Sequence, residues 1–198
     1  MANPGNRFDL EAMQDAVRRF LEASGHVIEG TELEPTPALV ARAWSETFLD
    51  GYEVDPKELF QEAYPLPKSR APSGMVLLKA IPFHGLCPHH LLPYHGLAHL
   101  AYLPGPKLAS LSSLTRLVDC YSHRLEIQET VTRQIADALV AHLRARGAAV
   151  LLETDQTCMT MRNAERRGTR TVTQHFSGSF GRRINLRLEF LRSLGSLP

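Results

Sequence analysis

The stretch richest in reactive side chains is FHGLCPHHLLPYHG, residues 83–96. Together with His99, it holds five of the nine histidines of the chain. Within it, Cys87 and His90 form a C-x-x-H arrangement, a spacing that lets one tight loop offer a sulfur and an imidazole to the same ion. Zinc takes three or four such ligands, so a metal site here needs at least one more donor from another part of the chain.

The third donor must come from one of the two remaining cysteines. Cys120 lies on an apolar face of a predicted helix, a pattern typical of a small buried hydrophobe. Cys158 lies in TCMTMR, which has the alternation of a strand, so that Met159 and Met161 would face the core and Cys158 the opposite side. The pattern therefore favours Cys158 as the third ligand.

Three protein ligands leave a fourth position for water, which is the arrangement of catalytic zinc sites. Zinc lowers the pKa of such a water to about 7, and His89, next to a predicted ligand, would be free for proton transfer. The alternative is a loop of hydrogen-bonded histidines with an unliganded cysteine. We assign His84, His95 and His99 to packing or hydrogen bonding under either interpretation.

Composition narrows the class of protein. The 198 residues predict one domain, and 22 Lys and Arg against 21 Asp and Glu argue against nucleic-acid binding. No apolar run approaches the roughly 18 residues of a membrane span, and the N-terminal residues lack the apolar core of a signal peptide. Three cysteines, an odd number, do not form a disulfide framework, so we expect a reduced cytoplasmic protein.

Hydrophobic periodicity and turn residues predict an α+β domain. Two helices, over residues 8–25 and from Thr36-Pro37 to near Gly51, precede a proline-rich loop over residues 64–74. The expected elements beyond it are strands over 75–83 and 96–104, helices over 112–124 and 126–147, strands over 148–155, 157–162 and 169–180, and a short C-terminal helix.

The segment CPHHLLPYHG resembles the C-E-H-H-x-x-P-x-x-G stretch of GTP cyclohydrolase I. The resemblance is colinear from about residue 30 to residue 180 and includes segments 36–52, 99–104, 113–139, 158–162 and 171–180. It implies the tunnelling fold (T-fold), an antiparallel sheet with two long helices, in a catalytic domain over 64–198 behind an N-terminal helical segment over 1–63. It also implies a toroidal decamer with active sites at subunit interfaces.

The resemblance implies a role for each matching residue. The zinc ligands would be Cys87, His90 and Cys158, the same three that spacing favours, and His89 would be a catalytic histidine. The purine's pyrimidine edge would be held by Gln128 and Glu129, and the triphosphate by Ser112, Arg116 and Arg162. A carboxylate suits guanine, which offers adjacent N–H donors; without the resemblance, Glu129 reads as a charge favoured by a helix N-terminus.

The chain departs from the family pattern at five positions. Gln156 stands where the family has a second catalytic histidine, and a glutamine hydrogen-bonds but does not shuttle protons. Ser113 replaces a lysine and Leu39 an arginine that contact the triphosphate, while Pro88 and Asn163 replace a glutamate and a glycine. The loss of two charge-assisted contacts would remove roughly 3–6 kcal/mol, or about 10² to 10⁴ in affinity.

The leading functional hypothesis is a zinc-dependent cyclohydrolase that opens the imidazole ring, at C8, of a guanine-like purine with fewer phosphates than GTP. One alternative is an ordinary GTP cyclohydrolase I that makes 7,8-dihydroneopterin triphosphate. A second is a catalytically weak binding or regulatory paralogue, which the three-ligand metal set disfavours. Each hypothesis predicts a small-molecule purine partner, no nucleic acid or membrane, and a homo-oligomer.

Overall fold

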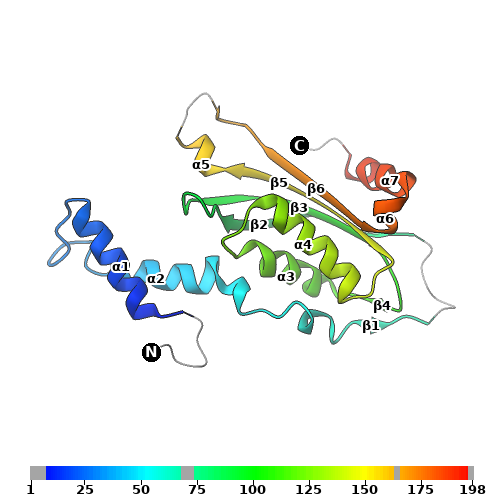
Figure 1. The fold of residues 1–198 in the computed structure, drawn as a ribbon, viewed down its shortest axis with the longest axis horizontal. Coiled ribbons are helices and arrows are strands. Elements are labelled where there is room, and N and C mark those ends of the chain that lie inside the picture. The colour runs from blue at the N-terminus through cyan, green and yellow to red at the C-terminus, as the bar shows by residue number, and fades with distance from the viewer. Residues whose placement is uncertain (1–7, 68–73, 163–165, 196–198) are drawn as a thin grey trace.

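The computed structural model describes residues 8–67, 74–162 and 166–195 and confirms the α+β architecture (Figure 1). Its helices are α1 (Leu10–Ala23), α2 (Thr36–Ala43), α3 (Leu111–Ser122), α4 (Gln128–Ala141), α5 (Thr157–Thr160), α6 (Ser179–Arg182) and α7 (Ile184–Leu194). Its strands are β1 (Tyr64–Pro65), β2 (Val76–Leu86), β3 (Pro93–Leu103), β4 (Lys107–Leu108), β5 (Gly147–Gln156) and β6 (Thr171–Gly178). Short π and 3₁₀ turns cover Trp44–Phe48, Asp50–Tyr52 and Glu58–Phe60.

The main sheet has four antiparallel strands in the order β2-β3-β5-β6. Strands β2 and β3 form a hairpin whose connecting loop, residues 87–92, is the centre of the reactive stretch. His84 pairs with His95 across this hairpin, and Tyr94 pairs with Gln156 on β5. The register therefore brings the reactive loop and the C-terminal end of β5 to the same end of the sheet.

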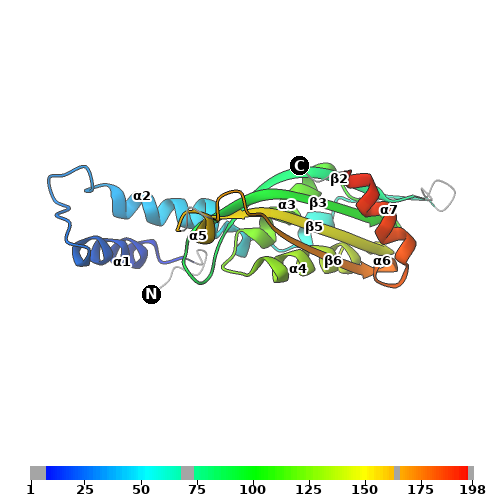
Figure 2. The same cartoon turned by 90° about the horizontal axis from the view of Figure 1, so that it is seen from above.

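Each face of the sheet packs against different helices (Figure 2). On one face, α3 and α4 bury the larger core, in which Leu117, Ile135 and Leu139 pack with the strands. On the other face, Phe180 and Phe190 of α6 and α7 cover only part of the sheet. Val131, Ile135 and Leu139 of α4 are fully buried, whereas Ile127 just before the helix is 40% exposed, and this burial fixes the orientation of α4 and its N-terminus.

The N-terminal helices α1 and α2 project from the end of the sheet near α5 as a two-helix arm (Figure 2). No residue of α1 is buried, and Phe20 on its predicted apolar face is 71% exposed. A largely apolar pocket of about 530 Å³ lies between the two helices and reaches His90 and Leu91. No helix within the described ranges is long and apolar enough to cross a membrane.

The strand predicted over residues 157–162 is wrong. Strand β5 ends at Gln156, opposite Tyr94 near the start of β3, so no partner strand remains for the residues that follow. The chain turns instead into α5, and Met161, predicted to face the core, is 77% exposed. The other predicted elements occur in the predicted order, but the helix predicted over 126–147 ends at Ala141. The loop predicted over 64–74 begins with the short strand β1, and its residues 68–73 lie outside the described ranges.

Candidate active site

A tight turn holds the reactive loop between β2 and β3. The Cys87 N–H donates to the Leu92 carbonyl at 2.9 Å, and the Leu91 N–H donates to the Cys87 carbonyl at 2.9 Å. Leu91 has φ of 55°, in the left-handed region that lets the chain reverse direction here. The turn buries Cys87 and leaves the side chains of His89 and His90 exposed, so the loop presents imidazoles above a buried sulfur.

The turn and α5 bring three donor atoms together from distant parts of the chain. The donor atoms of Cys87, His90 and Cys158 all lie within 4.8 Å of one another. Nδ1 of His90 is 3.8 Å from Sγ of Cys87, close to the roughly 3.4–3.8 Å that separates donors around a tetrahedral zinc ion. Two sulfurs and one imidazole nitrogen are a donor set that zinc prefers, so these residues fit the metal.

Helix α5 sets the position of Cys158. The Thr160 hydroxyl donates to Asp155 Oδ1 at 2.7 Å, and Arg170 pairs with Asp155 Oδ2 at 2.8 Å. The Thr160 hydrogen bond and the Arg170 guanidinium lower the pKa of the Asp155 carboxyl, so the carboxylate stays charged and ties α5 to β5. Burial and the adjacent Cys87 thiol raise the pKa of Cys158, which a bound cation would counteract by stabilising the thiolate.

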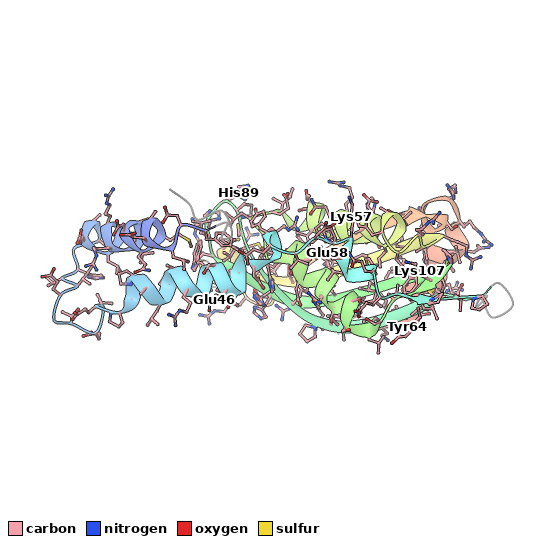
Figure 3. The ribbon with its side chains drawn as sticks, turned by 90° about the horizontal axis from the view of Figure 1, so that it is seen from below. Glu46, Lys57, Glu58, Tyr64, His89 and Lys107 are labelled. Atoms are coloured by element: carbon pink, nitrogen blue, oxygen red, sulfur yellow. The ribbon has the colours of Figure 1, made fainter. Side chains whose placement is uncertain are left out.

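His89 and Arg162 lie beside the three donors. Nδ1 of His89 is 3.9 Å from Sγ of Cys87, and an Nη1 of Arg162 lies 2.9 Å from Nε2 of His90. Arginine offers only donors, so Nε2 of His90 accepts this hydrogen bond, and in the metal-free neutral ring Nδ1 carries the proton and faces the Cys87 sulfur. Figure 3 shows His89 where the helical arm joins the body of the molecule.

Gln128 is buried, not open to solvent, although it was predicted to bind substrate. Its side-chain amide lies inside a hydrogen-bonded network with Thr154, Gln156 and Thr173, with donor–acceptor distances of 2.7–3.1 Å. Only 4% of its surface is exposed, and its amide is bonded within this network. Glu129, the next residue, is exposed at the first turn of α4 and lines a groove of about 380 Å³ with residues of β6.

The two residues predicted on α3 are not brought to the metal donors. Ser112 and Arg116 line a separate pocket of about 440 Å³ that includes Glu58. Figure 3 shows Glu58 well along the body of the molecule from His89. The pocket also holds the carboxylates of Glu53, Asp55 and Glu62. Within one chain, therefore, Ser112 and Arg116 lie in a separate pocket, whereas Arg162, the third predicted phosphate contact, lies beside the metal donors.

His84, His99, His123 and Cys120 have structural contacts. His84 stacks on His123 with ring centroids 4.2 Å apart, and Nδ1 of His123 lies 2.8 Å from Asp50. His99 is buried, as predicted for a packing residue, whereas His95 is exposed. Cys120 is 1% exposed and takes no part in the metal group.

Three further residues of the site region were not predicted from the sequence. Thr132, Thr154 and Thr173 complete the network around Gln128. Alternation along β5 places Thr154 on the same face as Gln156, which was a usable signal. The contact of Thr173 with Gln128 joins two segments far apart in the chain, and no local pattern indicates it.

Known proteins point to a class of hydrolases that act on cyclic amidines. The sequence model of GTP cyclohydrolase I matches residues 13–195. The "GTP cyclohydrolase 1" of Ralstonia nicotianae is 41% identical over 94% of this chain and 88% of its own length. The "GTP cyclohydrolase 1" of Chromobacterium violaceum is 39% identical over 94% of this chain and 89% of its own length. That of Dehalococcoides mccartyi (strain 195) is 38% identical over 93% of this chain and 96% of its own length.

The chain belongs to the GTP cyclohydrolase I family, whose members are zinc-dependent, generally oligomeric and use a purine substrate. This confirms the T-fold and the hydrolase class predicted from the reactive loop and its colinear segments. A solved structure titled "Crystal structure of the archaeosine synthase QueF-Like in the apo form" is 18% identical with a TM-score of 0.45, over 54% of this chain and 95% of that chain, a similarity too weak to add to this assignment.

Proposed function

We propose that this protein hydrolytically opens the imidazole ring, at C8, of a guanine-like purine that carries fewer phosphates than GTP. The observation that carries the reaction class is the convergence of Cys87, His90 and Cys158 in a chain of this family. Zinc, when bound by these residues, supplies a water activated near neutral pH. Three protein ligands are the number that leaves a position open for that water.

His89 is the proposed acid/base residue. Its imidazole is exposed and lies 3.9 Å from a metal donor, and an imidazole is the side chain best suited to exchange protons near neutral pH. In this role it delivers a proton to the imidazole-ring nitrogen released from C8. Gln156 has no proton to exchange in this range, so the chain brings one proton-transferring side chain where the family pattern has two.

The purine would be held at the first turn of α4. Glu129 is exposed there, and its carboxylate accepts hydrogen bonds from adjacent N–H donors of a guanine edge. The helix N-terminus adds backbone N–H groups near the same place. Gln128 supports this turn from inside and is a structural partner of the binding site in this proposal.

The residues around the predicted triphosphate site favour a substrate with fewer phosphates. Arg116 shares its pocket with four acidic residues, and the two departures at Leu39 and Ser113 remove two cations. The negative carboxylates repel a triphosphate, whereas the binding of a ribose with one phosphate or none is weakened little by this repulsion. Arg162, beside His90, remains as a cation near the metal donors.

Ordinary GTP cyclohydrolase I activity is the second candidate. Relatives that share 38–41% of their residues with this chain are named GTP cyclohydrolase 1, which favours GTP and the product 7,8-dihydroneopterin triphosphate. In that case Arg116 and Arg162, together with other arginines, would suffice for the triphosphate.

We also propose a homo-oligomer, a toroidal decamer by family resemblance, with the site completed between subunits. The separation of Arg116 from the metal donors within one chain and the exposed apolar side of α1 support this proposal. The three cysteines are free thiols, which suits a reduced cytoplasmic compartment. The division into a helical segment to residue 63 and a catalytic domain from residue 64 stays a prediction.

A substrate panel tests the proposed function. The zinc-loaded protein is incubated with GTP, GMP, guanosine, guanine and 8-oxoguanine, and products are identified by mass spectrometry. We expect ring opening of GMP or guanosine at least as efficiently as of GTP. Efficient conversion of GTP to 7,8-dihydroneopterin triphosphate with GMP and guanosine inert would show that the second candidate is correct.

Adding back the missing cations sharpens this test. The double change Leu39→Arg and Ser113→Lys should strengthen GTP binding by about 10² or more without improving GMP. Leu188→Arg with Ser193→Lys on α7 adds the same charges far from the site and serves as a control for net charge. Equal gains for GTP in both double variants would mean that the effect comes from net charge alone.

A further inference from the structure

The buried amide of Gln128 has only one orientation that its surroundings accept. Its Nε2 lies 3.2 Å from the Leu152 carbonyl and 3.3 Å from the Thr171 carbonyl. Carbonyl oxygens only accept hydrogen bonds, so the NH₂ group must face them and Oε1 must face the other way. The backbone of β5 and the residue at the start of β6 thus fix which end of this amide accepts.

This orientation determines that of Gln156. Oε1 of Gln128 accepts from the Thr154 hydroxyl at 2.7 Å and from Nε2 of Gln156 at 2.8 Å. Nε2 of Gln156 also lies 3.0 Å from Thr154 Oγ1. A reversed Gln156 would place two carbonyl oxygens against each other in a buried setting, which is unfavourable. Gln156 must therefore donate toward Gln128.

The network also holds the first turn of α4 from below. The Thr132 hydroxyl lies 2.7 Å from the backbone carbonyl of Gln128 and 2.6 Å from the Thr173 hydroxyl. The backbone and the side chain of Gln128 are thereby connected to both β5 and β6. Glu129 follows directly in the chain, so its placement depends on this set of hydrogen bonds.

We propose that Gln156 is a positioning residue that locks Gln128, and through it the Glu129 end of α4, in place of acting in proton transfer. This inference rests on the proposed function for the identity of the ligand, but the lock itself does not. Oε1 of Gln156 accepts no hydrogen bond within the described part of the chain and is not one of its buried unpaired polar atoms. It is the end of the amide opposite the one that contacts Gln128, at the end of β5 and two residues before Cys158.

Three variants of the full-length protein test the lock. Gln156→Glu keeps the size of the side chain but replaces the donor with an acceptor, Gln156→His restores a ring N–H donor, and Gln14→Glu on α1 is the same chemical change outside the network. Hydrogen–deuterium exchange of a peptide spanning residues 126–135 reports the first turn of α4 without any ligand. We expect exchange about tenfold faster in Gln156→Glu, and close to wild type in the other two.

Binding of GMP to the zinc-free protein, measured by calorimetry, tests the positioning role. The dissociation constant should rise about tenfold in Gln156→Glu and recover in Gln156→His. Unchanged exchange in Gln156→Glu would overturn the lock, and faster exchange with unchanged GMP binding would overturn the positioning role. If the wild-type protein neither binds nor opens any guanine compound, both the proposed function and the positioning role are wrong. The hydrogen–deuterium exchange experiment still shows in that case whether Gln156 locks Gln128.

Discussion

Cys158 is the residue on which the metal site depends most, because it is the donor that comes from outside the reactive loop, from α5 at the end of β5. Cys87 and His90 share one turn and are positioned by the same two backbone hydrogen bonds. Cys158 is held independently, by α5 and its contacts with Asp155. A metal ion bound by all three therefore also connects β5 to the β2–β3 hairpin.

Removal of Cys158 should abolish zinc binding. We expect zinc content, measured by plasma mass spectrometry after dialysis, to fall at least tenfold in Cys158→Ala, because two ligands do not hold zinc. Cys120→Ala is the matched control and should retain about one zinc per subunit, since Cys120 lies outside the donor group. Full zinc content in Cys158→Ala would contradict the ligand assignment.

Loss of the His89 imidazole should slow the reaction without loss of metal. General acid–base groups contribute about 10²- to 10⁴-fold, so kcat of His89→Ala on the true substrate should fall by that factor. Zinc content should stay unchanged, and His26→Ala, in the exposed loop after α1, should behave as wild type. Wild-type turnover in His89→Ala would place the role elsewhere, with His175 the next candidate.

Among the elements, β3 combines two environments along its length. At its end near the reactive loop, the side chains of Pro93 and His95 are exposed to solvent. His99, near its middle, is only 3% exposed. Nδ1 of His99 accepts from the Ala80 N–H at 3.4 Å, where β2 has a bulge and Ala80 takes φ of 55°. The imidazole thus supports an irregular point of the β2–β3 pairing.

His99 should make the fold sensitive to acid. Burial and the charge of Lys79 lower the pKa of His99, against the opposing effect of Glu153, so the folded protein resists a proton that the unfolded chain accepts near pH 6.5. The unfolded state then binds more protons, and stability declines as the pH falls below about 6.5. Thermal unfolding at pH 7.5 and 5.5 should show a smaller acid loss for His99→Gln than for wild type or for the control His142→Gln. An equal loss in all three would place the acid sensitivity elsewhere.

The sequence predicted the elements that local patterns define and missed those that depend on partners. Hydrophobic periodicity was enough for α3 and α4, and the C-x-x-H spacing was enough to pair Cys87 with His90. The segment after Gln156 alternates like a strand, but whether it pairs depends on where β3 begins, at Pro93, far earlier in the chain. Gln128 likewise sits at an exposed-looking helix start, and only the arrival of β5 and β6 buries it.

At the scale of the whole molecule, the residues of the candidate site lie in two separate places in one chain. The metal donors lie where the helical arm meets the sheet, and Arg116 lies in a different pocket along the body (Figure 3). The position of Asn163, one of the departures from the family pattern, lies outside the described residues. If the metal donors and Arg116 serve one reaction, each active site must combine the donors of one copy of the chain with Arg116 of another.

That division has a genetic consequence. The variants Cys158→Ala and Arg116→Ala carry their defects in different halves of a shared site, and we expect each alone to be inactive on a phosphorylated substrate that needs the Arg116 cation. When the two are mixed by denaturation and refolding or by co-expression, random assembly should give about a quarter of the sites both intact halves. Activity should therefore reappear in the mixture at about a quarter of the wild-type level, although neither parent shows it alone. A mixture as inactive as its parents would mean that each subunit works with its own residues only.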